Sequence, residues 1–369
     1  MYAPQSLYDI LFLMLYGGVA MIAFVAGIYL WLRRSNAIEP SVTPPKLLRR
    51  WTAAFFIMAA MSHVWWYVLG VYWLADDRLV RNTLCVMLDH ITLVPLVMAV
   101  LLRLLQDRQR SIWPWAVSQV LVIGSAAVGI AHHNDGGLDL MHYCQVAILA
   151  LFVGYYTYAL VQYSRWLKEN YADLDHKEVW QSLLFVVVLF LIYEVYSTNP
   201  GDMPTEYLSQ LNTLLIIGFL LWRVETLSSL TLEHEGESVD VSLPVDGSQE
   251  NRSYEPDLYY IGGLLEQQCE ATQLYLQHDL TLQQLASIIG TNRTYLSQYF
   301  AQQDITYNVY INHLRVQHFM RLYRDSISSS HPATATELAQ QSGFRSYSTF
   351  ATAFKQVNGQ TVTTWMKSL

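Results

Sequence analysis

Long apolar runs fill residues 8–227, and short amphipathic segments separated by turns fill residues 257–369. Crossing the hydrocarbon core of a bilayer takes about 20 mostly apolar residues. The first run, Tyr8 to Trp31, is too long for the apolar part of a signal peptide and lacks a basic segment before it, so we expect a retained anchor. Seven stretches have the required length, and they predict transmembrane helices at residues 8–31, 51–74, 82–105, 112–131, 138–163, 179–198 and 206–227.

The positions of lysine and arginine predict the orientation of these helices, because cytoplasmic loops carry an excess of both. The connections after the first, third and fifth spans are the basic ones, with Arg33, Arg34, Lys46, Arg49, Arg50, Arg108, Arg110, Arg165, Lys168 and Lys177. The opposite loops hold only Arg78 and Arg81. We therefore expect the N-terminus outside and the C-terminus in the cytoplasm, with the N-terminal domain covering residues 1–227.

An acidic stretch follows the last apolar run. Residues 228–256 contain several Ser and Gly, few aromatic residues and a single basic residue, Arg252. This composition is typical of a flexible, solvated tether. We expect a linker at 228–256 and a separate domain at 257–369.

The segment LTLQQLASIIGTNRTYLSQYF has the pattern of a helix-turn-helix unit. Thr281 and Gln284 have the spacing of a capping box, which starts a helix, and Gly290 supplies a tight turn. Leu296 and Phe300 form the buried pair of the second helix. The first helix should bury Leu282, Leu285, Ala286 and Ile289. The exposed face of the second helix offers short polar side chains that suit base edges in a major groove, namely Arg293, Thr294, Ser297 and Gln298.

The same design recurs about 53 residues later in TATELAQQSGFRSYSTFATAFKQVNGQT. Thr334 and Glu337 repeat the capping box, and Gly343 and Phe344 turn the chain. We expect an inner face of Tyr347, Phe350 and Phe354. The candidate DNA contacts of this unit are Arg345, Ser346, Ser348, Thr349 and Thr352.

Residues 307–324 between the two units predict one long helix of about 27 Å. That length is compatible with two recognition helices in major grooves about 34 Å apart. The expected fold is all-α, with a seven-helix transmembrane bundle followed by two helix-turn-helix units joined by a long helix.

The C-terminal residues resemble the DNA-binding domain of the AraC family. The resemblance lies in LTLQQLA, YLSQYFAQQ and GFRSYSTFATAFKQVNGQT, above all in the Gly-Phe turn, the Phe-x3-Phe-Lys helix and the Gly-x-Thr that follows. It implies a bacterial, sequence-specific transcription regulator that acts on promoter DNA, usually as a dimer. The sequence departs from the family at Thr361–Val362, where Thr-Pro is common, and at Thr352, where a basic residue is common.

The formal net charge of the whole chain is −8, and the C-terminal domain by itself is neutral. From Asp257 onward, seven basic residues balance seven acidic ones. Because phosphate neutralisation supplies most non-specific affinity for DNA, a neutral monomer should bind weakly. We therefore expect a homodimer, aided by confinement to the membrane surface.

Ionisable and polar residues inside the spans are candidates for a signal pocket, because burying them in lipid is costly. Most of them fall in the outer half of their spans, as would suit an external ligand. The alternative is that they form interhelical hydrogen bonds that hold the bundle together. The candidate pocket residues are His63, Asp89, His90, His142, Glu194 and Asn212.

Other chemistry has little support. The sequence lacks HExxH, a phosphate-binding glycine loop and a nucleophile elbow, so we expect no enzyme activity and no cofactor. No metal site is expected, since His132, His133 and Asp135 suit an exposed polar loop. The cysteines Cys85, Cys144 and Cys269 are too widely spaced for a ligand or disulfide framework.

The sequence is therefore compatible with three functions. The first is a sensor in the bacterial inner membrane, whose multi-pass bundle receives an unknown small-molecule signal and biases dimerisation or DNA affinity. The second is a DNA-binding regulator with the bundle as a passive anchor. The third, a transporter or enzyme with a fused regulatory domain, has the least support. The partners expected under the first two are promoter DNA, membrane lipid, a second copy of the chain and RNA polymerase.

Overall fold

The computed structural model describes residues 7–40, 42–69, 78–132, 135–197, 203–230, 258–327 and 334–369. These residues form helices and turns without a named β-strand, and the predicted all-α fold is confirmed. Of the predicted linker 228–256, only residues 228–230 lie in the described part of the chain.

The chain divides into two compact units that do not follow the order of the sequence. The first unit comprises residues 1–163 and 179–232, and the second comprises residues 164–178 and 233–369. The segment 164–178, which contains the end of one long helix and the residues after it, therefore groups with the C-terminal helices.

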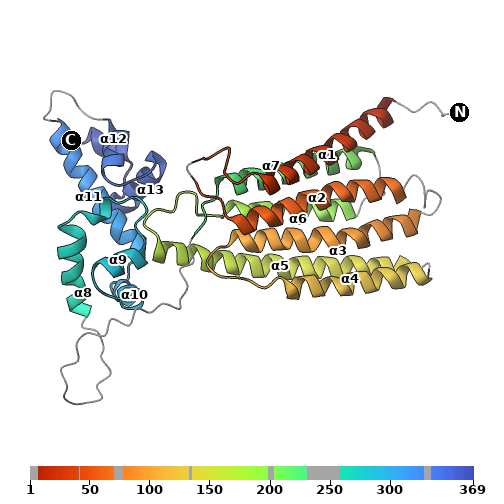
Figure 1. Ribbon diagram of the computed structural model, residues 1–369, viewed down its shortest axis with the longest axis horizontal. Helices are drawn as coiled ribbons and strands as arrows, with labels where there is room; N and C mark the ends of the chain where they lie inside the picture. The colour runs from red at the N-terminus through yellow and green to blue at the C-terminus, as the bar shows by residue number, and fades with distance from the viewer. Residues whose placement is uncertain are drawn as a thin grey trace, which may run out of the picture. The chain divides into compact units, whose positions relative to one another are not determined.

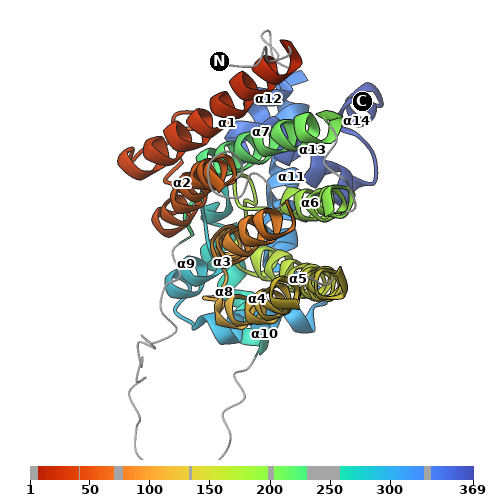
Figure 2. The same cartoon turned by 90° about the vertical axis from the view of Figure 1, so that its right-hand side faces the viewer.

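The first unit is a bundle whose helices run side by side (Figures 1 and 2). Five of them, α1, α3, α4, α5 and α7, are long and apolar enough to cross a membrane. The number of spans and their orientation stay predictions. The helices are α1 (Leu7–Leu32), α2 (Lys46–Val68), α3 (Arg78–Leu104), α4 (Trp113–His132), α5 (Asp135–Asn170), α6 (Gln181–Ser197) and α7 (Met203–Thr226).

Close contacts between neighbouring helices explain the packing of the bundle. A Cβ atom at Gly27 of α1 would lie 2.8 Å from Cγ1 of Ile57 in α2, so only glycine allows this approach. In α5, the buried Tyr156 hydroxyl lies 2.7 Å from the hydroxyl of Ser182 in α6. Helix α5 continues to Asn170, past the end of the apolar run at residue 163.

A buried ion pair joins α2 to the end of α7. Nη1 of Arg49 lies 2.9 Å from Oε1 of Glu225, and both side chains are buried. Arg49 also donates to Oδ1 of Asn36 at 2.9 Å, and the backbone N–H of Ala37 donates to Glu225. These bonds supply partners that a buried pair of charges requires. The chain just before the predicted linker is therefore held in place.

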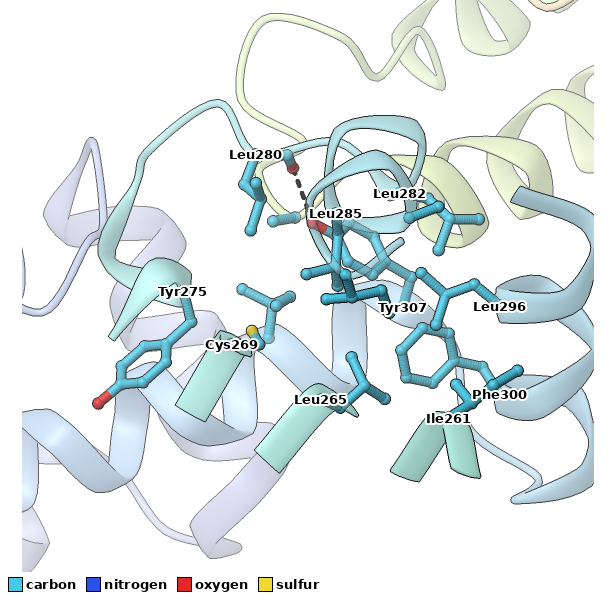
Figure 3. Packing of buried hydrophobic residues seen from close by; sticks show 14 residues of the cluster. Ile261, Leu265, Cys269, Tyr275, Leu280, Leu282, Leu285, Leu296, Phe300 and Tyr307 are labelled. Carbon is cyan, nitrogen blue, oxygen red and sulfur yellow. Dashed lines mark hydrogen bonds between the residues drawn. The ribbon is translucent and has the colours of Figure 1, made fainter. Parts of the chain in front are cut away.

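The helices of the second unit are shorter. They are α8 (Leu258–Leu265), a π-helical segment (Glu266–Glu270), a 3₁₀ turn (Leu274–Leu276), α9 (Leu282–Ile288), α10 (Arg293–Gln302), α11 (Tyr307–Ile327), α12 (Ala335–Gln341), α13 (Tyr347–Asn358) and α14 (Val362–Lys367). Side chains of α8, α9, α10 and α11 meet in one core, shown in Figure 3. A second core forms where the later part of α11 packs with α12, α13 and α14. The long helix α11 thus contributes to both.

Candidate nucleic-acid interface

The first helix-turn-helix unit is α9–α10, and its helix ends form as the sequence predicts. Thr281 caps α9, accepting a hydrogen bond from the backbone N–H of Gln284, whose side chain accepts one from the N–H of Thr281. Gly290 has a φ of 74°, which favours glycine and makes the turn. Asn292 then caps α10 by accepting from the N–H of Tyr295. Local capping therefore fixes where the recognition helix begins.

Helix α10 buries one face and exposes the other. Leu296 and Phe300 point into the first core, as Figure 3 shows. On the opposite face, the predicted contact residues Thr294 and Gln298 are exposed, and Ser297 is half-buried. This face can meet base edges.

The fourth predicted residue of α10 already has a partner within the chain. Nε of Arg293 donates to Oδ1 of Asn170 at 3.0 Å. Asn170 belongs to the segment 164–178, which sequence reasoning left outside the site. The only signal there was the lysine and arginine residues of the surrounding loop, which also holds four acidic residues.

The second helix-turn-helix unit is α12–α13. The Thr334 and Glu337 capping box is present, and hydrogen bonding to Thr334 lowers the pKa of the Glu337 carboxyl from its usual value. Gly343 turns the chain with a φ of 88°. Ser346 caps α13 by accepting from the N–H of Thr349, and the two hydroxyl groups lie 2.9 Å apart. Both are therefore engaged in the cap.

Ser348 and Thr352 are exposed on the outer face of α13, and Arg345, two residues before the helix begins, is also exposed. Nη2 of Arg345 lies 2.6 Å from Oδ2 of Asp279, so this predicted DNA contact is paired with a carboxylate. Phe350 and Phe354 are buried, as predicted. The expected inward position of Tyr347 is wrong. Its side chain is 38% exposed because it lies in the first turn, with its ring against the edge of the core.

A groove between α13 and α14 adds polar residues that the sequence analysis did not assign. Lys355 lies one turn after Thr352, so both line the same groove. The Phe-Lys pair was noted only as part of the family pattern, although it places a cation on this face. The other polar residues that line the groove are Gln356, Thr361 and Thr363.

Arg315 of α11 lies at the junction of the two cores and is 1% exposed. Its Nε donates to the carbonyl oxygen of Tyr275 and its Nη2 to that of Gln277, both at 2.7 Å. The guanidinium lies 5.7 Å from the centre of the Phe344 ring. Burial lowers the pKa of this guanidinium from its ordinary value. A buried cation of this kind positions the two helix-turn-helix units rather than contacting DNA.

The cysteine of the first core, Cys269, is in an environment that makes it unreactive. Cys269 is fully buried, and burial raises the pKa of its thiol to about 12. The thiolate is the reactive form of cysteine, so this side chain acts as a small apolar residue.

Two of the predicted pocket residues of the bundle form interhelical hydrogen bonds. Asp89 of α3 accepts from the Ser62 hydroxyl at 2.7 Å and from Nε1 of Trp66 at 2.9 Å, both in α2. Nε2 of His63 in α2 lies 3.0 Å from Oε1 of Gln210 in α7. The structure thus connects α2 to α3 and to α7 through polar groups, as the interhelical reading requires.

The remaining pocket candidates are not brought together by contacts among the described residues. His90 is 2% exposed, and no hydrogen-bond partner is found for either ring nitrogen in the described structure. His142 and Asn212 are half-buried. The side chain of Glu194 lies outside the described part. Among the candidates whose side chains the structure describes, His90 is the one with buried polar atoms that lack a hydrogen-bond partner.

The arrangement of the second unit defines a class of protein: a DNA-binding domain with two helix-turn-helix units on one connecting helix. Residues 285–368 match the model of a helix-turn-helix domain, and they form an AraC-type domain, as the resemblance implies. The match supports the class of helix-turn-helix transcriptional regulators.

Curated relatives match the same end of the chain. The uncharacterized HTH-type transcriptional regulator SAR0107 of Staphylococcus aureus (strain MRSA252) is 30% identical over 100 residues. The regulator SACOL0084 of Staphylococcus aureus (strain COL) is 29% identical over 100 residues. In both cases the alignment covers 26% of this chain and 12% of the relative's length. No solved structure matches the chain.

Proposed function

We propose that the chain is a membrane-bound, sequence-specific DNA-binding transcriptional regulator. The observation that carries the proposal is the pair of capped recognition helices, α10 and α13, on the shared helix α11. The proposed domains are a seven-span bundle at 1–227, an acidic linker at 228–256 and the DNA-binding domain at 257–369. The bundle lies in the bacterial inner membrane with its C-terminus in the cytoplasm.

The proposed contacts with promoter DNA are polar side chains at the start and outer face of each recognition helix. Arg293, Thr294, Ser297 and Gln298 serve one major groove, and Arg345, Ser346, Ser348, Thr349 and Thr352 serve the next. The pairing of Arg345 with Asp279 removes cationic charge from this surface. A homodimer supplies the additional phosphate contacts that a neutral domain lacks.

The proposal predicts that Gln298→Ala weakens DNA binding by about 5- to 150-fold, because a glutamine amide paired to a base contributes about 1–3 kcal/mol. The probe is a duplex selected from a random-sequence pool with the full-length wild type in nanodiscs. Binding is measured by fluorescence anisotropy at fixed salt concentration. Gln302→Ala, an exposed glutamine one turn later in α10, is the matched control and should bind within about twofold of wild type. Equal affinities for both variants would contradict the assignment of this face.

We further propose that the bundle senses an extracytoplasmic or membrane signal. His90 supports this role, since a buried imidazole without a partner is costly unless something else binds it. The bonds from Ser62 and Trp66 to Asp89 also make the α2–α3 interface sensitive to the charge of one carboxyl group. If these bonds only hold the helices together, the bundle is a passive anchor instead.

The two roles are separated by a reporter gene placed under the selected DNA site. For a sensor, Asp89→Asn should change reporter output at least about twofold at equal protein levels, because it weakens a hydrogen bond between α2 and α3. Thr92→Ala is the control, since the Thr92 hydroxyl donates only to Leu88 in its own helix. If Asp89→Asn, His90→Ala and Glu194→Gln all leave every regulatory response unchanged, the bundle is an anchor.

A further inference from the structure

The segment after α5 is built into the first helix-turn-helix unit. Ala172 is 1% exposed and lies in the same core as Leu280 and Ile311. Its backbone N–H donates to the carbonyl oxygen of Leu280 at 3.4 Å, and Tyr171 forms an isolated antiparallel bridge with Thr281. The segment thus meets the residues that lead into α9 at a single antiparallel bridge, a short form of the strand pairing by which peptides are recognised.

A side chain of α11 completes this docking site. Nδ2 of Asn308 donates to the carbonyl oxygens of Ala172 at 2.7 Å and Tyr171 at 3.2 Å. Asn312 donates in turn to Oδ1 of Asn308 at 3.1 Å, which orients the amide. Buried carbonyl groups without donors are costly, so Asn308 makes the docked position of this segment favourable.

The docked segment engages the first residue of a recognition helix. Asn170 is 8% exposed, and its Nδ2 donates to the carbonyl oxygen of Trp166 at 2.7 Å. That bond directs Oδ1 toward Nε of Arg293, 3.0 Å away. The guanidinium of Arg293 is therefore bonded to the protein at the position where a cation would approach DNA.

The other end of the segment lies near Asp279, the carboxylate that pairs with Arg345 of the second helix-turn-helix unit. Nζ of Lys177 lies 4.0 Å from Oδ1 of Asp279, and Arg345 binds the other oxygen of the same carboxylate. The Lys177 side chain is 7% exposed, and burial lowers the pKa of its ammonium group from the usual value. One short segment thus contacts Arg293 of the first helix-turn-helix unit and Asp279, the counter-ion of Arg345 in the second.

We propose that residues 170–177 are an intramolecular ligand of the DNA-binding region, and that the segment competes with DNA for Arg293. This inference rests on the proposed DNA-binding function. The segment connects α5 to α6 in the chain, so a signal that moves either helix can draw it out of its docking site. The proposal gives the bundle a direct covalent route to the recognition helix, separate from the linker at 228–256.

Docking itself can be tested without DNA. In full-length protein in nanodiscs, amide hydrogen exchange of residues 170–174 should be slow in the wild type. Asn308→Ala should speed this exchange at least about tenfold, because the carbonyl groups of Tyr171 and Ala172 lose the amide that donates to them. The bundle peptides should not change. Unchanged exchange of residues 170–174 in Asn308→Ala would overturn the docking site, whatever the protein does with DNA.

Competition is tested with the selected duplex and two substitutions at one position. Asn170→Ala removes the acceptor of Arg293 and should tighten DNA binding by about fivefold. Asn170→Asp replaces it with a carboxylate and should weaken binding by about fivefold, since charge-assisted bonds are stronger. Ser164→Asp, which adds the same charge earlier in α5, should stay within about twofold of wild type.

The outcomes separate this inference from the function on which it rests. Affinity that is equal in Asn170→Ala and wild type, while Gln298→Ala still loses binding, would overturn the competition and leave DNA binding intact. Equal weakening by Asn170→Asp and Ser164→Asp would also overturn it, because the effect would then be one of added charge alone. Failure to select any duplex would instead contradict the DNA-binding function.

Discussion

Full-length protein carrying Arg315→Met is expected to unfold its second unit at a clearly lower urea concentration than the wild type. Methionine replaces much of the volume but none of the donors. The carbonyl oxygens of Tyr275 and Gln277 would lose their 2.7 Å bonds, and that of His278 would lose a contact at 3.4 Å. Relief of the buried charge offsets part of this loss, which leaves a net destabilisation of about 3 kcal/mol.

The same substitution should also impair DNA binding. Arg315 connects α11 to the segment before α9 through its hydrogen bonds. Its guanidinium also contacts Phe344 of the second helix-turn-helix unit. Without it, the relative position of α10 and α13 is less well defined. Two recognition helices must fit successive major grooves at a fixed spacing, so looser positioning lowers affinity even where every contact residue is present.

Stability can be measured by pulse proteolysis in urea, with cleavage sites mapped to residues 257–369. Arg324→Met is the matched control, because Arg324 lies in the same helix with an exposed side chain. It should shift stability by less than about 0.5 kcal/mol. Arg315→Lys should fall between the two, since lysine keeps the charge but cannot reach both carbonyl groups with fixed geometry. Similar midpoints for Arg315→Met and Arg324→Met would contradict the role assigned to Arg315.

The helix-turn-helix units were predictable because their signals are local. The capping boxes at Thr281 and Thr334 each act over three residues, and both reciprocal bonds form. Gly290 and Gly343 both adopt the positive φ that a tight turn needs. The predicted helix over residues 307–324 is confirmed as α11. Each of these features depends on neighbours in the chain rather than on the tertiary fold.

The roles of Arg315 and Asn308 could not be read from the sequence, because their partners are distant in the chain. Arg315 contacts a carbonyl group 40 positions away, and Asn308 contacts one 136 positions away. A sequence count treats Arg315 and Arg345 as cations available to DNA. In the structure, Arg315 is buried and Arg345 is paired with Asp279, so fewer positive charges remain at the surface.

The bundle illustrates the same limit. Hydropathy placed the ends of the apolar runs, but α5 continues to Asn170 because a helix need not end where it becomes polar. The sequence showed how far along a span each polar residue lies, but it did not show which residue each one contacts. Whether Asp89 faces Trp66 depends on how α3 is rotated, which is set by packing against its neighbours.

Gly343→Ala is expected to destabilise the second unit by about 4 kcal/mol, from a strained φ and from steric overlap. The φ of 88° lies in the left-handed region, which costs a residue with a Cβ atom about 1–2 kcal/mol. The new Cβ would also lie 2.9 Å from the Cα and carbonyl oxygen of Leu276. These are backbone atoms, so they cannot move aside as a flexible side chain would.

The equivalent turn of the first helix-turn-helix unit provides the control for this prediction. Gly290 has a similar φ of 74°, but a Cβ there would meet no atom within 4 Å. Gly290→Ala should therefore cost only the backbone term, about 1 kcal/mol. The Cβ of Gly343→Ala would in addition lie 3.0 Å from Nε of Arg315, so it should disturb the bonds of Arg315 as well. In urea unfolding of the full-length chain, equal destabilisation by the two substitutions would mean that only the turn conformation matters. A larger effect at Gly343 would show that this turn is also where the two helix-turn-helix units are held together.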